Sequence, residues 1–340
     1  MQNKRVLIVR TDRVGDVVMI TPVIREIRKK FPESFIAALT NTNTSDILIN
    51  NPYLDLTIKD DLRKESFFPV VKEIRRHKFT DGLLVMPTER AAYQMFLAGI
   101  KNRTGVGKKL YEVITFMKSV SRNKYIPLRH EADYCMDLAR SIGVETDNLT
   151  PEIFLTDIDR NYGKEILLNK SSGKSAFKII VHTGSGKSSS NWSEDKYFQL
   201  IKRILSENLN AEIILTAKEM SGTFIRNIKE LKNDSVIFVQ DNISRLRDLI
   251  CIISAADLLI AASTGPLHLA SAMKVKTIGL YCHRRMSCVR HWGALGNEAV
   301  NLEVSAEFCD AACSADKEIC RFENGISVDE VLYNIKQVYK

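Results

Sequence analysis

The chain has 340 residues, a length that suits two domains, and 45% of them are hydrophobic, as in ordinary globular proteins. Lysine and arginine outnumber aspartate and glutamate by 49 to 41, which favours polyanionic partners such as phosphorylated sugars, acidic lipid headgroups or nucleic acid. No apolar run approaches the roughly 18 residues of a membrane span, and the run at residues 6–9 is too short for a secretory signal. We therefore expect a cytoplasmic protein.

The first part of the chain alternates short apolar runs with amphipathic segments. A strand is predicted at residues 4–10, followed by a helical segment that reaches residue 31 and is kinked or restarted at Thr21-Pro22. Further strands are predicted at residues 35–39, 56–58, 82–85 and 104–106, and helices at residues 44–49, 62–77 and 89–97. Because consecutive parallel strands need a crossover connection, usually a helix, this alternation predicts a parallel sheet.

Asp16 lies where the first predicted strand gives way to a helix. The positive end of the helix dipole stabilises a carboxylate there as the anion. At a cleft, such an anion is able to accept a proton from a sugar hydroxyl as a general base. N-capping is the commoner use of aspartate at this position, so both roles stay open.

Residues 101–130 are strongly basic, with a single acidic residue, Glu112. The basic residues are Lys101, Arg103, Lys108, Lys109, Lys118, Arg122, Lys124 and Arg129. An apolar stripe at helical spacing accompanies them, formed by Leu110, Val113, Ile114 and Met117. The pattern predicts peripheral contact with an anionic membrane surface or an acidic lipid-linked substrate, and a helix packed on its own domain is the alternative. Nucleic acid is not expected, because aromatic stacking platforms are not interleaved with the positive charges.

A second series of alternating units follows a predicted helix at residues 131–142. Strands are predicted at residues 178–182, 211–216, 236–239, 257–260 and 277–281, and helices at residues 193–205, 221–231, 244–255, 269–273 and 328–339. We therefore expect an α/β protein with two Rossmann-like domains that face a central cleft. The expected boundaries are residues 1–155 and 175–325, with a linker at 156–174 and a C-terminal helix at 326–340.

Residues 257–281 are predicted to form a strand, a tight loop, a helix and a second strand. Gly265 allows the backbone to approach a ligand closely, and Pro266 suits the first helical turn. The first N–H groups of such a helix carry partial positive charge, which makes the loop a candidate phosphate site. An ordinary Gly-Pro turn is the alternative. His268 is equally compatible with a phosphate contact and with a buried core position.

The loop after the strand at 178–182 contains Gly184 to Ser188 and resembles part of a phosphate-binding P-loop. A P-loop also requires glycine at position 181, which is Val181, and a helix that begins earlier than residue 193. A P-loop ATPase or kinase is therefore not expected. The loop still follows the carboxyl end of a strand, where open α/β sheets bind phosphate or ribose.

The cysteines do not predict a metal site or a disulfide framework. Their spacing in the C-terminal part matches no standard zinc module, so free thiols are expected at Cys288, Cys309, Cys313 and Cys320. The chain also shows no Asp-x-Asp pattern where a cation-dependent transferase would need one. We expect no metal and no cofactor.

Two motifs resemble glycosyltransferase family 9, the ADP-heptose:lipopolysaccharide heptosyltransferases. The first comprises Val14 to Val18 followed by Thr21-Pro22, and the second runs from Ser263 to Ala270. Weaker similarities occur at residues 98–105, at Asn191-Trp192 and at residues 326–331. The resemblance therefore extends in order along nearly the whole chain.

The resemblance implies a GT-B fold, with the acceptor held by the N-terminal domain, the nucleotide sugar by the C-terminal domain, and inverting, metal-independent transfer. Asp16 matches the general base of the family. Acceptor-binding residues are expected at Arg10, Arg13 and Gly15. Donor-binding residues are expected at Ser185, Lys187, Glu219, Ser263, Thr264, Gly265, Pro266 and His268. The implied substrates are ADP-heptose, or a related nucleotide sugar, and a phosphorylated lipid A–core acceptor.

The chain departs from the family pattern at two positions. Ser263 stands where the family usually has aspartate, and Ser190 where it usually has lysine; candidates for the missing positive charge are Lys187, Arg284, Arg285 and Arg290. Two other functions are compatible with such a two-domain protein. A nucleotide-sugar epimerase needs no separate acceptor, and a nucleotide-sugar-binding protein performs no chemistry.

Overall fold

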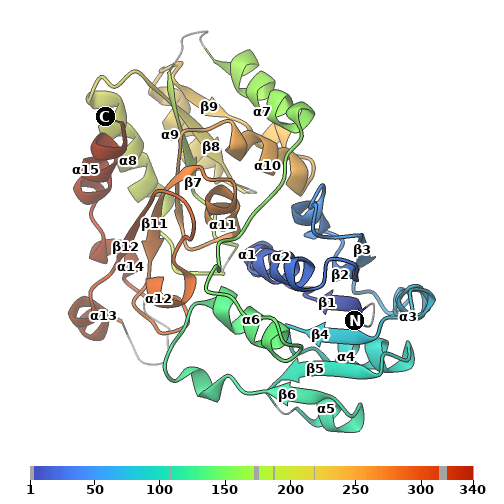
Figure 1. Ribbon diagram of the computed structural model, residues 1–340. Coiled ribbons are helices and arrows are strands. Elements are labelled where there is room, and N and C mark those ends of the chain that lie inside the picture. Colours follow the sequence, from blue (N-terminus) through green and yellow to red (C-terminus); the bar gives the residue numbers. More distant parts are fainter. Residues whose placement is uncertain are drawn as a thin grey trace. The chain divides into compact units, whose positions relative to one another are not determined.

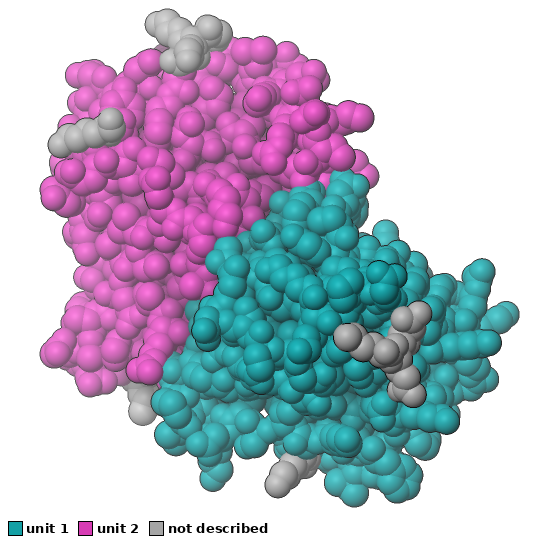
Figure 2. All heavy atoms as spheres, in the orientation of Figure 1, with its two compact units in different colours: residues 1–154 teal, residues 155–340 magenta. Residues whose placement is uncertain are grey.

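The computed structural model describes residues 4–107, 109–171, 176–186, 188–217, 219–313 and 320–339. The chain divides into two compact units, residues 1–154 (unit 1) and 155–340 (unit 2), which Figure 2 colours separately. Each unit contains a six-stranded parallel sheet with interleaved helices (Figure 1), which confirms the predicted α/β class. Within the described ranges, no helix combines the length and the apolar character needed to cross a bilayer.

Unit 1 is built on a sheet with the strand order β3-β2-β1-β4-β5-β6. Its strands are β1 (Arg5–Val9), β2 (Phe35–Asn41), β3 (Leu56–Asp60), β4 (Asp81–Leu84), β5 (Asn102–Val106) and β6 (Lys118–Val120). Its helices are α1 (Val14–Val18), α2 (Thr21–Lys30), α3 (Phe67–Arg76), α4 (Glu89–Leu97), α5 (Leu110–Ile114) and α6 (Glu131–Arg140), with 3₁₀ turns at Ser45–Leu48 and Asn123–Tyr125. The central strands are buried, as expected where helices cover both faces of a parallel sheet.

The helical segment predicted after β1 is interrupted and restarts as α2. Pro22 lies in the first turn of α2, where its missing N–H costs no helical hydrogen bond. The hydroxyl of Thr21 donates to the carbonyl of Val18 at 2.8 Å, and Ile20 occupies the N-cap position. The short helix α1 is thereby separated from α2 and directly follows the end of β1.

Unit 2 is built on a sheet with the order β12-β11-β10-β7-β8-β9. Its strands are β7 (Phe177–His182), β8 (Ala211–Thr216), β9 (Val236–Phe238), β10 (Leu258–Ala262), β11 (Lys276–Tyr281) and β12 (Ala299–Glu303). Its helices are α7 (Asp157–Lys170), α8 (Glu194–Ser206), α9 (Gly222–Glu230), α10 (Leu246–Ser254), α11 (Gly265–Ala272), α12 (Val289–Trp292), α13 (Ala306–Ala312), α14 (Phe322–Gly325) and α15 (Val328–Tyr339), with a 3₁₀ turn at Gln240–Asn242.

The segment expected as a linker contains α7, which packs on α10 inside unit 2. A Cβ atom on Gly163 would lie 2.0 Å from the carbonyl oxygen of Cys251, so the two helices approach at backbone distance. Nη2 of Arg247 also donates to Oδ2 of Asp159 at 2.7 Å. These contacts make α7 part of the fold of unit 2.

Both sheets have the same strand order, which reverses once in each unit. The reversal lies between β1 and β4 in unit 1 and between β7 and β10 in unit 2. Connections leave the two neighbouring strands in opposite directions, so ligands of open α/β sheets bind at the carboxyl ends of these strands. In unit 1, Asp16 follows β1, and in unit 2 the segment from Ser263 to Pro266 follows β10.

Candidate active site

Asp16 lies inside α1, at the carboxyl edge of the sheet of unit 1. The N-cap residue of α1 is Arg13, so Asp16 is not the residue that caps the helix. The side chain of Asp16 is 16% exposed, which leaves it partly accessible to a ligand. Its Oδ1 accepts a hydrogen bond from Nη2 of Arg10. Arg10 therefore orients the carboxylate, which stays partly accessible to a ligand.

Arg10 donates hydrogen bonds to the carboxylates of Asp12, Asp16 and Glu131, and only 4% of its own surface is exposed. Its Nε donates to Asp12 at 2.9 Å, and its Nη1 donates to Glu131 on α6 at 2.8 Å. A second cation, Arg122, lies 3.6 Å from the same oxygen of Glu131. Arg10, predicted from the sequence as an acceptor-binding residue, directs its guanidinium at these acids and at Asp16.

The ionisation of this cluster follows from its burial. Burial raises the pKa of Asp12 to about 6, with Arg10 lowering it and the charge of Asp16 raising it. Burial disfavours the Arg10 cation, but the acids around it raise the pKa of the guanidinium well above its usual value. Burial also raises the pKa of Cys135 far above the usual range of a thiol, so this residue adds no charge.

Arg13 and Gly15, the other two predicted acceptor residues, flank Asp16 differently. Arg13 is exposed at the start of α1, whereas Gly15 is buried within it. An exposed guanidinium beside the candidate base suits a phosphorylated ligand, because arginine pairs with phosphate in a bidentate manner. Glu131, Asp12 and Arg122 complete this region, and sequence patterns do not reveal them.

In unit 2, the loop between β10 and α11 presents the start of a helix. Thr264 is the N-cap residue, and its carbonyl accepts hydrogen bonds from the amides of Leu267 and His268 at 3.1 and 3.4 Å. The Thr264 hydroxyl donates to the carbonyl of Ala262 at 3.1 Å and so braces the loop. The helix begins at Gly265, four residues earlier than predicted. Leu267 and His268 donate to Thr264 and Pro266 has no N–H, so the amide of Gly265 is the first-turn amide left for a ligand. This is the arrangement that binds phosphate.

His268 is buried behind this loop, with 2% of its surface exposed. Its ring lies 5.5 Å from that of Trp292. The structure therefore places His268, itself in the first turn of α11, in the interior of unit 2.

The loop after β7 is held by Asn191. Nδ2 of Asn191 donates to the carbonyl of Thr183 at 2.7 Å, and the hydroxyl of Tyr197 donates to Oδ1 of Asn191 at 2.8 Å. The carbonyl of Ser185 accepts from the amide and hydroxyl of Ser188, at 2.9 and 2.6 Å, in a tight turn. Lys187, the predicted phosphate contact in this loop, lies outside the described residues.

The remaining predicted donor residue, Glu219, is exposed and follows β8. Because β8 pairs with β7 and β7 with β10, the segments after these strands begin at the same edge of the sheet. His182, at the end of β7, also belongs to this edge, and its Nδ1 lies 2.9 Å from the hydroxyl of Thr216. Burial lowers the pKa of His182 to about 4, so the ring is neutral at physiological pH. No motif in the sequence marks His182 as a site residue.

None of the seven cysteines forms a disulfide. Cys309 and Cys313 form a hydrogen bond, and burial raises the pKa of Cys309 to about 11. Cys320 lies 3.5 Å from the hydroxyl of Ser190. Among the residues that the structure describes, no group of three or more His, Cys, Asp and Glu is arranged to hold a metal ion.

Comparison with known proteins relates this arrangement to one family. Residues 68–319 match the family described as "Glycosyltransferase family 9 (heptosyltransferase)". A candidate glycosyltransferase of Haemophilus influenzae is 28% identical over 98% of the chain and 96% of its own length. The lipopolysaccharide core heptosyltransferase OpsX of the same organism is 23% identical over 89% of the chain and 86% of its own length. The structure of the ADP-heptose lps heptosyltransferase II of E. coli matches with a TM-score of 0.77 at 15% identity, covering 98% of each chain, which confirms the GT-B fold.

Proposed function

Because the chain belongs to glycosyltransferase family 9 and is a glycosyltransferase, we propose that it transfers heptose, or a related sugar, from an ADP-sugar to a phosphorylated lipid A–core acceptor of lipopolysaccharide. The observation that carries the proposal is the partly exposed Asp16, oriented by the buried Arg10 at the strand-order reversal of unit 1. The similarity to heptosyltransferases of lipopolysaccharide supports the choice of substrates.

On the acceptor side, Asp16 acts as the general base. Its carboxylate takes the proton of the acceptor hydroxyl as the hydroxyl oxygen attacks the anomeric carbon of the donor. A new carbon–oxygen bond forms, the bond between the sugar and the diphosphate breaks, and ADP leaves with the bonding electrons. Attack from the face opposite the leaving group inverts the anomeric configuration. Arg10 orients the carboxylate of Asp16 through its hydrogen bond, and the exposed Arg13 pairs with a phosphate of the acceptor.

On the donor side, the first turn of α11 stabilises the charge that develops on the departing diphosphate. The amides of Thr264 and Gly265 are the donors for this purpose, since Pro266 has no N–H. Ser185 and Ser263 add hydroxyl groups at the same edge, and Glu219 binds the adenosine ribose. Arg284 and Arg285, which follow β11, supply positive charge in place of a metal ion. The serine at position 263, in place of the usual aspartate, alters the contacts to the donor sugar.

The acceptor of this reaction is anchored in a membrane. We therefore propose that the protein works in the cytoplasm, at the inner face of the inner membrane. The proposed reaction uses neither a nucleic acid nor a cofactor.

Incubation of the purified protein with ADP-heptose and core-truncated lipopolysaccharide tests the proposal. Mass spectrometry of the lipopolysaccharide is expected to show an added heptose, with release of one ADP for each product. Epimerised donor in the absence of acceptor would instead identify an epimerase. Donor binding without turnover would identify a binding protein.

A further inference from the structure

The segment from Lys109 to Lys118 turns apolar side chains outward. Leu110 is 76% exposed, Val113 67% and Phe116 79%. Ile114 continues this surface, as do two residues at the end of α4, and the rings of Phe96 and Phe116 lie 6.5 Å apart. α5 contacts α4, and β6 pairs with β5 at the edge of the sheet (Figure 1). The exposed side chains are named the apolar patch, which comprises Phe96, Leu97, Leu110, Val113, Ile114 and Phe116.

The apolar patch is fixed from beneath by buried contacts. Glu112, 1% exposed, accepts from the amide of Lys109 at 3.3 Å. Nε of the buried Arg103 donates to the carbonyl of Thr115 at 3.2 Å. Tyr111 and Met117 pack against the hydrophobic core of unit 1. The segment is therefore not a helix that packs its apolar stripe on its own domain, because only part of that stripe is buried.

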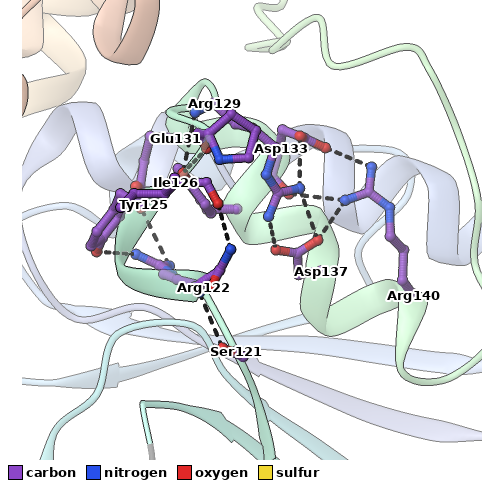
Figure 3. A network of polar contacts seen from close by, with 12 residues as sticks. Ser121, Arg122, Tyr125, Ile126, Arg129, Glu131, Asp133, Asp137 and Arg140 are labelled. Atoms are coloured by element: carbon purple, nitrogen blue, oxygen red, sulfur yellow. Dashed lines mark hydrogen bonds and ion pairs between the residues drawn. The ribbon is translucent and has the colours of Figure 1, made fainter.

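The basic residues around the patch divide into two groups. Arg103 is buried. Arg129 pairs with Asp133 and Asp137, and Arg122 contacts Tyr125 and Glu131 (Figure 3). These three arginines are engaged inside unit 1, which corrects their assignment to a basic surface. Lys108 lies outside the described residues. The exposed cations of the stretch are Lys101, Lys109, Lys118 and Lys124.

Three of these lysines lie within four residues of a patch residue along the chain. Lys101 follows the end of α4, Lys109 precedes α5, and Lys118 begins β6. Exposed apolar side chains with exposed lysines close by in the sequence match the layering of an anionic bilayer surface, in which acyl chains lie below a level of phosphate groups. Lysine is depleted in the contact surfaces of protein complexes, so the border is less suited to a protein partner.

We propose that the apolar patch docks this protein on an anionic lipid bilayer. Leu110, Val113 and Phe116 enter the boundary between headgroups and acyl chains, while the lysine ammonium groups stay at the phosphate level. The inference rests on the proposed function in one respect, which is that the acceptor is lipid-anchored. It adds that apolar insertion, and not charge alone, holds the enzyme at the surface.

Flotation with vesicles tests the proposal in the absence of donor and acceptor. The vesicles contain phosphatidylcholine with or without phosphatidylglycerol. The wild type is expected to float with the anionic vesicles and to retain part of its binding at high salt, since apolar insertion is not screened. The triple variant Leu110→Ser, Val113→Ser, Phe116→Ser is expected to bind at least about tenfold more weakly, a loss of about 1.4 kcal/mol.

A matched control removes equally exposed apolar side chains elsewhere. Phe68 is 72% exposed on α3, and Ile158 and Leu168 are 81% and 63% exposed on α7. The triple variant Phe68→Ser, Ile158→Ser, Leu168→Ser is expected to float like the wild type. In the single variant Phe116→Trp, tryptophan emission is expected to shift to the blue with anionic vesicles and to be quenched by brominated lipid.

The proposal would be overturned if the wild type did not float, if the patch variant floated as well as the wild type, or if the control variant lost as much binding as the patch variant. It would also be overturned if the wild type did not bind vesicles but formed a dimer that the patch variant failed to form, because the patch would then be a protein interface.

Transfer assays separate this inference from the proposed function. The patch variant is expected to keep its kcat/KM on a deacylated, soluble core fragment and to lose it on vesicle-embedded acceptor. Flotation without any transfer would contradict the proposed function alone.

Discussion

Arg10 and Glu131 are 121 positions apart in the chain, yet Nη1 of Arg10 donates to Oε1 of Glu131 at 2.8 Å inside unit 1. The same guanidinium binds Asp12 and Asp16. Glu131, on α6, therefore helps to fix the orientation of Arg10, and Arg10 in turn orients Asp16. The acceptor side of the site depends on a buried ionic network as well as on its surface residues.

Removal of Arg10 is expected to destabilise unit 1. Arg10→Ala leaves buried carboxylates without their partner, and breaking a buried ion pair from one side costs about 3–5 kcal/mol. Glu131→Gln keeps an acceptor oxygen for Nη1 of Arg10, so it is expected to lower the free energy of unfolding by less than Arg10→Ala does. Urea unfolding monitored by circular dichroism gives both free energies. Equal stability of Arg10→Ala and the wild type would show that the network contributes nothing to the fold.

Asp16→Asn is expected to reduce turnover by about 10²–10⁴-fold, because the amide cannot take the proton of the acceptor hydroxyl. The amide oxygen still accepts the hydrogen bond from Arg10, so the fold and the affinity for the donor are expected to persist. Steady-state kinetics and calorimetric titration with ADP measure the two quantities. A variant with full turnover would show that Asp16 is not the base.

Hydrophobic periodicity and turn residues were sufficient to predict most of the fold. They indicate the central strands because buried parallel strands read as continuous apolar runs, as at β1, β7 and β10. The edge strands β6 and β12 are only partly buried and carry no such signal. Periodicity also cannot distinguish a buried cation from a solvated one, and Arg103 and Arg122 are examples. Ion pairs between distant segments, such as that of Arg10 with Glu131, leave no local pattern at all.

The stability of the protein is expected to fall as the pH rises from about 4 to about 6 through the contribution of Asp12. An unfolded aspartate loses its proton near pH 4, whereas burial raises the pKa of the folded Asp12 to about 6. Between these pH values the folded state binds more protons than the unfolded state. Asp12 therefore lowers the free energy of unfolding by up to about 1.4 kcal/mol for each unit of rising pH. Asp12→Asn is expected to remove that contribution. Urea unfolding at several pH values gives the free energy of unfolding of both proteins. If it changed with pH by the same amount in the wild type and in Asp12→Asn, the raised pKa of Asp12 would be wrong.

Chelator is expected to leave the transfer rate unchanged. The proposed stabilisation of the leaving diphosphate uses the start of α11 and nearby arginines, and neither needs a divalent cation. The measurement is ADP release before and after dialysis against EDTA, with Mg²⁺ or Mn²⁺ restored in a parallel sample. Activity that disappears with the chelator and returns with the cation would argue for a metal-dependent transfer.

The anomeric configuration of the transferred sugar tests the central claim most directly. Nuclear magnetic resonance of the product formed by the wild type from ADP-heptose and core-truncated lipopolysaccharide gives this configuration. The mechanism with Asp16 as base predicts a linkage opposite in configuration to the donor, formed about 10²–10⁴-fold more slowly by Asp16→Asn. A product that retains the donor configuration, or equal product from Asp16→Asn, would contradict it.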